Sequence, residues 1–285
     1  MRQLLVPLVV FFSLQAQAVK IISMNVEFFW DTEEPHEGQI VGYGEGKIQP
    51  PSSKEFVLKA YGIAKTIEAE DADIVGLIEI ENENVVNSIR QYLDSEWKVI
   101  FVKGRDTYTG QDVGLLTRFD VIPNTATNFP GYIGEAPDGT DKRPSKVLGI
   151  QLTDHTDKYC VYVAHLLSKR GSNDSARLAQ ADAIRNAVVD QYGQCDHYIV
   201  MGDMNDLPGS AVLERLKGQG DPQRDLRQTA NTAGNNADYS YVFRGSKQLI
   251  DHILVDRDLA NGAEFYTLQL PEAITDHRAV ILDTR

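Results

Sequence analysis

Short apolar runs that end in polar side chains are the feature that most constrains the fold of this sequence. In "HYIVMGDMNDLPGS", the apolar residues 198–201 run directly into Gly202, Asp203 and Asn205. Apolar runs of about four to eight residues, bounded by turn-forming residues, are typical of buried strands. The chain is therefore expected to build a sheet whose strands are buried along their length and polar at their ends.

The same pattern recurs at or near the ends of other predicted strands. The polar residues there are Asn25 in "ISMNVE", Glu79 in "GLIEIEN", His165 in "YVAHLLS", Asp251 in "LIDHILV", and Asp276 with His277 in "ITDHRAV". Any one of them alone would be typical of a cap, a turn or a hydrogen-bonded structural residue. Because strand ends converge in a sheet, their joint occurrence predicts that they line one pocket.

Helical segments and strand pairs alternate along the chain. Residues 52–73 have Ser52 and Glu55 at the spacing of a capping box and apolar residues on one helical face. Residues 146–152 and 158–166 are expected to form a pair of strands around a polar turn. This order predicts one mixed-sheet α/β domain over residues 19–285 rather than a purely parallel doubly wound sheet.

The first residues have the pattern of a secretory signal. In "MRQLLVPLVVFFSLQAQAVK", a basic Arg2 precedes a short apolar run, and Ala16 and Ala18 form a small-x-small cleavage site. A membrane anchor is disfavoured because the apolar run is shorter than the ~20 residues that span a bilayer. We expect a signal peptide over residues 1–18 and an exported protein, periplasmic or extracellular, without stable membrane association after cleavage.

Export would place Cys160 and Cys195 in an oxidising compartment, where a disulfide persists. Each cysteine precedes a predicted strand, and strands that lie side by side would bring the cysteines to the same end. A disulfide is therefore expected, with two free thiols as the alternative. On the chain-entropy model the bond would stabilise the fold by ~3–4 kcal/mol.

Charge and residue types narrow the class of chemistry. The formal net charge of −13 disfavours a protein that coats nucleic acid by bulk charge, but not an enzyme that engages phosphates locally. Glu79, Asp203 and Asp276 offer hard oxygen ligands, which suit Mg²⁺, Mn²⁺ or Ca²⁺ rather than zinc. The sequence contains neither a P-loop nor a G-x-S-x-G motif. Metal-assisted hydrolysis of a phosphoester by water is the class that these residues favour.

The order of these motifs resembles the endonuclease/exonuclease/phosphatase superfamily, whose type member is pancreatic deoxyribonuclease. The matching segments are "MNVE", "IEIEN", "DVGLLTR", "RPSKV", "VYVAHL", "VMGDMND", "IDHILV" and "TDHRAV". The resemblance implies a four-layered α/β sandwich, in which two packed mixed β-sheets are flanked by helices. It also implies a divalent metal cofactor, for which Mg²⁺ is expected and Mn²⁺ or Ca²⁺ are alternatives.

Metal and water roles follow from the same resemblance. Glu79 resembles the principal metal carboxylate, and Asn25 helps to hold that site. Asp203 resembles the carboxylate that orients or deprotonates the attacking water, or that binds a second metal. Asp276 resembles a further metal or water ligand.

Phosphate and proton-transfer roles fall on a second group of residues. Asn205 resembles the residue that hydrogen-bonds the scissile phosphate, and His165 and His277 resemble the pair that flanks it. In the family each histidine is oriented by a carboxylate, which predicts Asp251 as the partner of His277 and Asp112 as the partner of His165.

Two further residues are assigned to the phosphate, and one position departs from the family pattern. Arg143 in "KRPSKV" resembles a phosphate-contacting arginine, and Tyr108 is placed near the phosphate. Pancreatic-type enzymes often carry an arginine that enters the DNA minor groove, whereas Glu81 stands at that position here. His252 is expected on the opposite sheet face from Asp251 and is left out of the site.

These features predict an exported, monomeric, divalent-metal-dependent nuclease that acts on DNA, with RNA as a further substrate. "TGQDVGLLTR" most resembles bacterial secreted nucleases of the family. The alternative is a phosphoesterase on a lipid or small molecule, such as a sphingomyelinase-like enzyme, which would favour an exposed apolar hairpin. "NFPGYIG" and "VEFFW" are the candidates for such a hairpin, and both are short. A non-catalytic binding protein is disfavoured because the motif residues are all present.

Overall fold

The computed structural model describes residues 18–32, 51–106, 109–169, 171, 173–218, 220, 224–232 and 238–285. Two of the sequence-based expectations, the signal peptide and the position of Tyr108, fall on residues 1–17 and 108, outside the described residues. Within the described residues, no helix combines the length and the apolar character that a membrane span requires.

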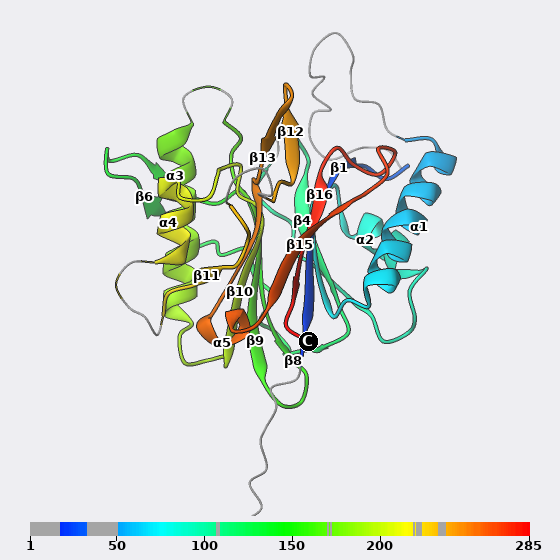
Figure 1. Cartoon of the computed structure of the whole chain (residues 1–285), viewed down its shortest axis with the longest axis horizontal. Coiled ribbons are helices and arrows are strands. Elements are labelled where there is room, and N and C mark those ends of the chain that lie inside the picture. Colours follow the sequence, from blue (N-terminus) through cyan, green and yellow to red (C-terminus); the bar gives the residue numbers. More distant parts are fainter. Residues whose placement is uncertain are drawn as a thin grey trace, which may run out of the picture.

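Two six-stranded sheets pack face to face at the centre of the molecule (Figure 1). The first has the order β15-β16-β1-β2-β4-β3 and the second has the order β11-β14-β10-β9-β8-β5. Each sheet has one parallel pair at its centre, β1 with β2 and β9 with β10, and its other pairs are antiparallel. Both sheets are therefore mixed, as expected.

The strands of the first sheet are β1 (Lys20–Phe29), β2 (Ile74–Ile80), β3 (Lys98–Phe101), β4 (Asp112–Thr117), β15 (Glu264–Gln269) and β16 (Arg278–Asp283). Those of the second are β5 (Asp120–Val121), β8 (Lys146–Thr153), β9 (Lys158–His165), β10 (His197–Asp203), β11 (Arg227–Gln228) and β14 (Asp251–Val255). Two small hairpins are formed by β6 (Gly134–Glu135) with β7 (Asp141–Lys142), and by β12 (Tyr241–Phe243) with β13 (Ser246–Gln248).

Helices cover the outer faces of both sheets. The helices are α1 (Ser53–Glu70), α2 (Glu83–Arg90), α3 (Asp174–Asp190), α4 (Ala211–Lys217) and the single turn α5 (Arg257–Ala260). Helices α1 and α2 pack on the first sheet, and α3 and α4 pack on the second (Figure 1). The result is a four-layered α/β sandwich, which confirms the expected fold.

Helix α1 shows how local sequence sets these boundaries. The Ser52 hydroxyl accepts a hydrogen bond from the Glu55 amide at 3.3 Å, and the Glu55 carboxylate accepts one from the Ser52 amide at 2.9 Å. This capping box satisfies amides that a helix start leaves free. The buried face of the helix consists of Ala60, Ile63, Ala64 and Ile67, as its periodicity predicts.

Alternation along each strand decides what faces the space between the sheets. In β10, Ile199 and Met201 belong to the core between the sheets, whereas Tyr198 and Val200 face the outer helices. Every residue of this strand is buried, which explains why it appears in the sequence as a continuous apolar run. Asp203 follows Met201 by two residues, so it caps the inter-sheet core with a carboxylate.

The predicted disulfide is present between Cys160 and Cys195, whose Cα atoms are 5.7 Å apart. Cys195 precedes β10 as expected, but Cys160 lies within β9, on the face that packs against the outer helices. The parallel pairing of the two strands brings the cysteines together near their amino ends.

Candidate active site

The carboxyl ends of the two central parallel pairs meet at one cleft of about 520 Å³ between the sheets. Its walls include Glu79, His165, Asp203, Asn205, Asp276 and His277. Asn25 and Asp251 lie behind this wall and hydrogen-bond to residues that line it. The structure thus brings these predicted residues together from both sheets.

Asn25 links the two sheets at the floor of the cleft. Its amide nitrogen donates to Glu79 Oε1 at 3.3 Å and to Asp203 Oδ2 at 3.1 Å. Its amide oxygen accepts a hydrogen bond from the Glu27 backbone N–H at 3.0 Å. A carboxamide can donate to two carboxylates without adding charge, so the buried Asn25 fixes the positions of both acids.

Glu79 reaches the cleft through a local break in strand alternation. A register shift separates Ile78 from Ile80, and Glu79 between them has a left-handed φ of 66°. Its Oε2 atom accepts hydrogen bonds from the Phe28 amide at 3.1 Å and from Gln111 Nε2 at 2.7 Å. A non-glycine residue in this conformation costs free energy, and such strain is frequent at functional sites.

The Gly202–Asn205 turn aims two polar groups at the cleft. Gly202 has a φ of 136°, and a Cβ atom there would lie 1.9 Å from the Ala164 carbonyl oxygen, so glycine is required. The Asn205 amide N–H donates to Asp203 Oδ1 at 2.8 Å, and Asn205 Nδ2 donates to the Leu166 carbonyl at 3.0 Å. Burial, together with the nearby Asp251 charge, raises the pKa of Asp203 to about 8.

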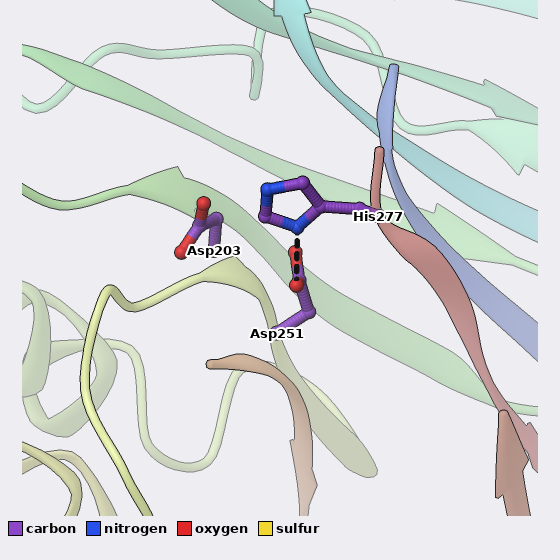
Figure 2. A group of neighbouring side chains, drawn as sticks. All are labelled: Asp203, Asp251 and His277. Atoms are coloured by element: carbon purple, nitrogen blue, oxygen red, sulfur yellow. Dashed lines mark hydrogen bonds and ion pairs between the residues drawn. The ribbon is translucent and has the colours of Figure 1, made fainter. Parts of the chain in front are cut away.

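His277 is held by Asp251, its predicted partner. Its Nδ1 atom lies 2.7 Å from Asp251 Oδ2, and Figure 2 shows the Asp203 carboxylate beside the same ring. The Tyr241 ring stacks on the imidazole with a centroid distance of 4.7 Å. Burial opposes the charged ring, but the Asp251 carboxylate outweighs it and raises the pKa of His277 to about 10. His277 is therefore cationic near neutral pH.

His165 has the opposite character. Its Nε2 atom lies 3.8 Å from Asp203 Oδ2 and 3.9 Å from Glu79 Oε1, and its Nδ1 atom has no hydrogen-bond partner among the described residues. Burial, and then the positive charges of Lys146 and His277, hold the pKa of His165 well below its ordinary value. The cleft thus combines one neutral and one cationic imidazole.

The sequence profile of the Endonuclease/Exonuclease/phosphatase family matches this chain from residue 25 to residue 277. The chain belongs to this family. The matched range begins at Asn25 and ends at His277, so it spans the first and the last residues of the cleft described above. Members of the family are hydrolases that act on phosphoester bonds.

Solved structures of the family share the fold. The endonuclease/exonuclease/phosphatase from Bacteroides vulgatus superposes with a TM-score of 0.62 at 17% identity, covering 94% of this chain and 98% of that one. D. rerio TDP2, complexed with single strand DNA product, gives 0.62 at 14%, covering 94% and 99%. The human Nocturnin catalytic domain, with bound sulfate anion, gives 0.59 at 15%, covering 93% of each. Comparison with curated protein sequences finds no match.

Asp112 does not reach His165 in this member of the family. Its Oδ1 atom accepts a hydrogen bond from the Gly104 amide at 3.0 Å, and its Oδ2 atom lies 2.7 Å from Lys103 Nζ. Gly104 packs so closely that a Cβ atom there would lie 2.1 Å from Asp112 Oδ1. The expected His165–Asp112 pair is thus corrected to an Asp112–Lys103 pair, because the Gly104 amide and the Lys103 ammonium group hold the two carboxylate oxygens.

Arg143, the predicted phosphate contact, is exposed on the segment between β7 and β8 and is not part of the cleft wall. Lys146, three residues later, instead supplies a positive charge to the cleft. Its Nζ atom lies 3.0 Å from Asp106 Oδ2 and 3.1 Å from Gln111 Oε1. Sequence analysis missed Lys146, although its position at the start of β8, in the "RPSKV" segment, was a usable signal.

Glu27 is a second residue that sequence analysis missed. Its Oε2 atom accepts a hydrogen bond from the Asp276 amide at 3.1 Å, and its carbonyl accepts one from Lys59 Nζ at 2.6 Å. Burial, and then the charge of Asp276, raises the pKa of Glu27, and burial also raises the pKa of Asp276. The position of Glu27 two residues after Asn25 was the available signal.

The donor set of the cleft fits a divalent cation. Burial, and then the charges of neighbouring carboxylates, raise the pKa values of Glu27, Asp203 and Asp276, so added positive charge in the cleft would stabilise their ionised forms. In addition, ligand atoms of Asp203, Asp251 and His277 lie within 4.8 Å of one another (Figure 2), and Asp251 Oδ1 is buried without a hydrogen-bond partner among the described residues. Clustered carboxylate oxygens suit a hard cation such as Mg²⁺.

His252, which was left outside the site, belongs to a structural network, and so does Asp206. His252 is fully buried on the opposite face of β14, with Nε2 2.8 Å from the Asp206 carbonyl. Asp206 itself pairs with Lys169 at 2.7 Å and with buried Arg177 at 3.2 Å. This network fixes the start of α3 against the turn after β10, so the Arg177 guanidinium is not available to a nucleic-acid backbone.

Proposed function

We propose that this chain is an exported, divalent-metal-dependent nuclease that hydrolyses phosphodiester bonds of DNA, with RNA as a further substrate. The observation that carries the proposal is the convergence of a cationic His277, a neutral His165 and the Asp203 carboxylate on one cleft. This combination can accept a proton from water and can stabilise negative charge on a phosphate at the same time.

Glu79, Asn25 and Asp276 are the residues that would hold the metal, with Glu27 beside them. A bound divalent cation would neutralise phosphate charge and lower the pKa of a bound water. With the charge of the cation beside it, Asp203 would be ionised despite its raised pKa, and its carboxylate would take the proton of the attacking water as the new P–O bond forms. Asn205 would donate its amide to a phosphate oxygen, and His277 would stabilise the charge of the departing oxygen as the ester P–O bond breaks.

Nucleic acid is favoured as the substrate by two kinds of support. D. rerio TDP2, which shares the fold, is solved as a complex with single strand DNA product, and Nocturnin carries a sulfate anion. In this chain, Lys146 and His277 supply local positive charge to the cleft despite the net charge of −13. Export is supported by the pattern of the first 18 residues and by the Cys160–Cys195 disulfide, which persists in oxidising compartments.

A phosphoesterase acting on lipid remains the second candidate, because one observation favours it. The β12–β13 hairpin stands beside the cleft and exposes Val242 and Phe243 at 47% and 46%. An exposed apolar hairpin is what docking on a bilayer requires. This hairpin is not one of the segments that the sequence suggested for the purpose.

The test is to incubate the mature protein, residues 19–285, with plasmid DNA, RNA or sphingomyelin vesicles, each with Mg²⁺ or with a chelator. The nuclease proposal expects DNA cleavage that requires the metal. Metal-dependent cleavage of lipid without cleavage of DNA would instead establish the second candidate. Export is tested by fractionating cells of the native host and locating the protein. A cytoplasmic protein that still carries residues 1–18 would contradict export.

A further inference from the structure

A second cavity of about 310 Å³ adjoins the catalytic cleft beneath the β12–β13 hairpin. Ser168, Asn205, Tyr241 and Ile250 line both spaces, so the two are continuous. Asn205 is the residue assigned to the scissile phosphate. A group bound in the second cavity would therefore lie next to the position assigned to that phosphate.

The hairpin that covers this cavity is fixed in position. Arg244 and Gly245 both have positive φ values, 49° and 81°, which is the two-residue turn that matches the twist of a tight hairpin. At its base, the buried Ser240 hydroxyl accepts hydrogen bonds from the amides of Ile250, at 3.1 Å, and Asp251, at 3.0 Å. The hairpin is thus joined directly to the residue that holds His277.

The two faces of the hairpin differ. Tyr241 and Phe243 alternate with Val242, so the two aromatic rings share the face that lines the cavity. Tyr241 also stacks on His277. Val242 belongs to the other face, although it is as exposed as Phe243. The cavity therefore has an aromatic wall that begins at the catalytic histidine and ends at an exposed ring.

We propose that this cavity receives the nucleobase next to the scissile phosphate, unstacked from a single strand, with Phe243 as its stacking surface. The inference rests on the proposed nuclease function and adds a substrate form to it. An aromatic face stacks on any base, and base stacking on such side chains is a sequence-tolerant way to bind single strands. A base inside a duplex is already stacked and paired, so it cannot enter.

The lining of the cavity favours a base over an acyl chain. Gln248, Asn205 and Ser168 present an amide, a second amide and a hydroxyl beside the aromatic wall. A base edge offers donors and acceptors to these groups, whereas an acyl chain would remove them from water without replacement, which is costly. The charged groups of Arg244 and Lys247 lie over the Phe243 and Tyr239 rings, so the hairpin also carries positive charge that suits the flanking phosphates.

Phe243→Ala tests the proposal, with Val242→Ala as the matched control from the opposite face of the hairpin. The substrates are a single-stranded oligonucleotide, the same oligonucleotide with one abasic residue beside the cleaved bond, and the duplex. In Phe243→Ala, the ratio of kcat/KM for base-bearing to abasic single strand should fall about 10-fold, which is within the range for one stacked base. The ratio of single-strand to duplex cleavage should also fall. Val242→Ala should leave both ratios unchanged.

The outcomes separate this inference from the function on which it rests. A wild-type protein that cleaves neither strand form refutes the nuclease function and the inference together. A wild type that cleaves DNA, with both ratios unchanged in Phe243→Ala, refutes the inference alone. If Phe243→Ala and Val242→Ala both weaken binding to sphingomyelin vesicles and neither changes a ratio, the hairpin is a membrane contact and the inference is overturned.

Discussion

The paired strands β9 and β10 have a buried histidine near an aspartate at each end, and the two ends differ in how their polar atoms are satisfied. At the amino end, His197 Nδ1 lies 3.3 Å from Asp256 Oδ2. Asp256 also accepts a hydrogen bond from the Tyr198 amide at 2.8 Å and caps α5 through its other oxygen. At the carboxyl end, His165 Nδ1 and Asp251 Oδ1 are buried without hydrogen-bond partners among the described residues.

This difference indicates that the amino end stabilises the fold, whereas the carboxyl end is less stable because its polar groups are arranged for catalysis. At the amino end, the Cys160–Cys195 disulfide and the hydrogen bonds that Asp256 accepts hold the strands together. At the carboxyl end, unpartnered polar atoms and the left-handed Glu79 and Asn205 cost stability. A bound metal and substrate would supply the missing partners there. The comparison leads to tests of four variants, from the largest expected effect to the smallest.

Asp203→Asn should have the largest effect, because it removes the proton acceptor of the catalytic end. We expect kcat to fall about 10³-fold or more, within the range for loss of a general base, while the fold remains intact. Steady-state cleavage of an oligonucleotide with Mg²⁺ measures the loss. A variant that keeps its full rate would show that Asp203 does not act on water.

The same variant should change how stability depends on pH. The pKa of Asp203 in the fold is about 8, above its ordinary value of 3.8. Its contribution is therefore fully present below about pH 4 and is lost as the pH rises through 8. In urea unfolding with a chelator present, Asp203→Asn should lose less stability than the wild type between pH 5 and pH 9. Equal losses in both proteins would contradict the raised pKa.

Replacing both cysteines by serine tests the amino end. The disulfide closes a loop with a sequence separation of 35, so its loss should lower the free energy of unfolding by ~3–4 kcal/mol. Cleavage well below the melting temperature should be unaffected, since the bond lies at the opposite end of β9 from His165. Urea unfolding and activity are measured in parallel. A folded variant with reduced kcat would contradict the view that the amino end contributes to stability alone.

His165→Ala returns to the catalytic end with a smaller expected effect. The rate should fall by at least ~10² if the imidazole acts in the transition state. Because the pKa of His165 is well below its ordinary value, the ring should stay neutral, and its contribution should not titrate between pH 6 and pH 8. A pH–rate profile of wild type and variant checks this, and a wild-type step near pH 6.5 that the variant lacks would contradict it.

His197→Gln should have the smallest effect, and only on stability. Burial opposes the charged ring, but Asp256 outweighs it and raises the pKa of His197 above 6.5. Its stabilisation is therefore present below pH 6.5 and is lost as the pH rises through the folded-state pKa. We expect a loss below about 1 kcal/mol at pH 5.5 that disappears at pH 9, measured by thermal unfolding. A loss of stability that grows with pH would contradict the raised pKa of His197.

Strand alternation explains why much of the candidate site could be predicted from the sequence. Asn25, His165, Asp203 and Asp251 each extend the face of a strand whose apolar residues fill the inter-sheet core. An apolar run with a polar end thus predicts that the polar side chain is buried and that it points to the space between the sheets. The pairing of Asp251 with His277 was predicted from the family resemblance instead, and the two side chains lie 2.7 Å apart.

The remaining contacts depend on packing between segments that alternation does not govern. Asp112 pairs with Lys103 rather than His165 because Gly104 folds over its carboxylate. Lys146 enters the cleft, and Arg143 does not, through the course of the segment before β8. The aromatic wall of the β12–β13 hairpin was also missed, because its strands have only three residues each and their pairing depends on the turn at Arg244 and Gly245.

Because β1 pairs with β16, the site can form only after both strands have been synthesised. These are the first and the last strands of the described chain, and they lie side by side with Ile22 opposite Ile281. Asn25 belongs to the first, and His277 directly precedes the last. A growing or truncated chain that lacks the final strand therefore has no complete cleft. For an enzyme proposed to cut DNA, this order of assembly means that no complete cleft can form until β16 has been synthesised and paired with β1.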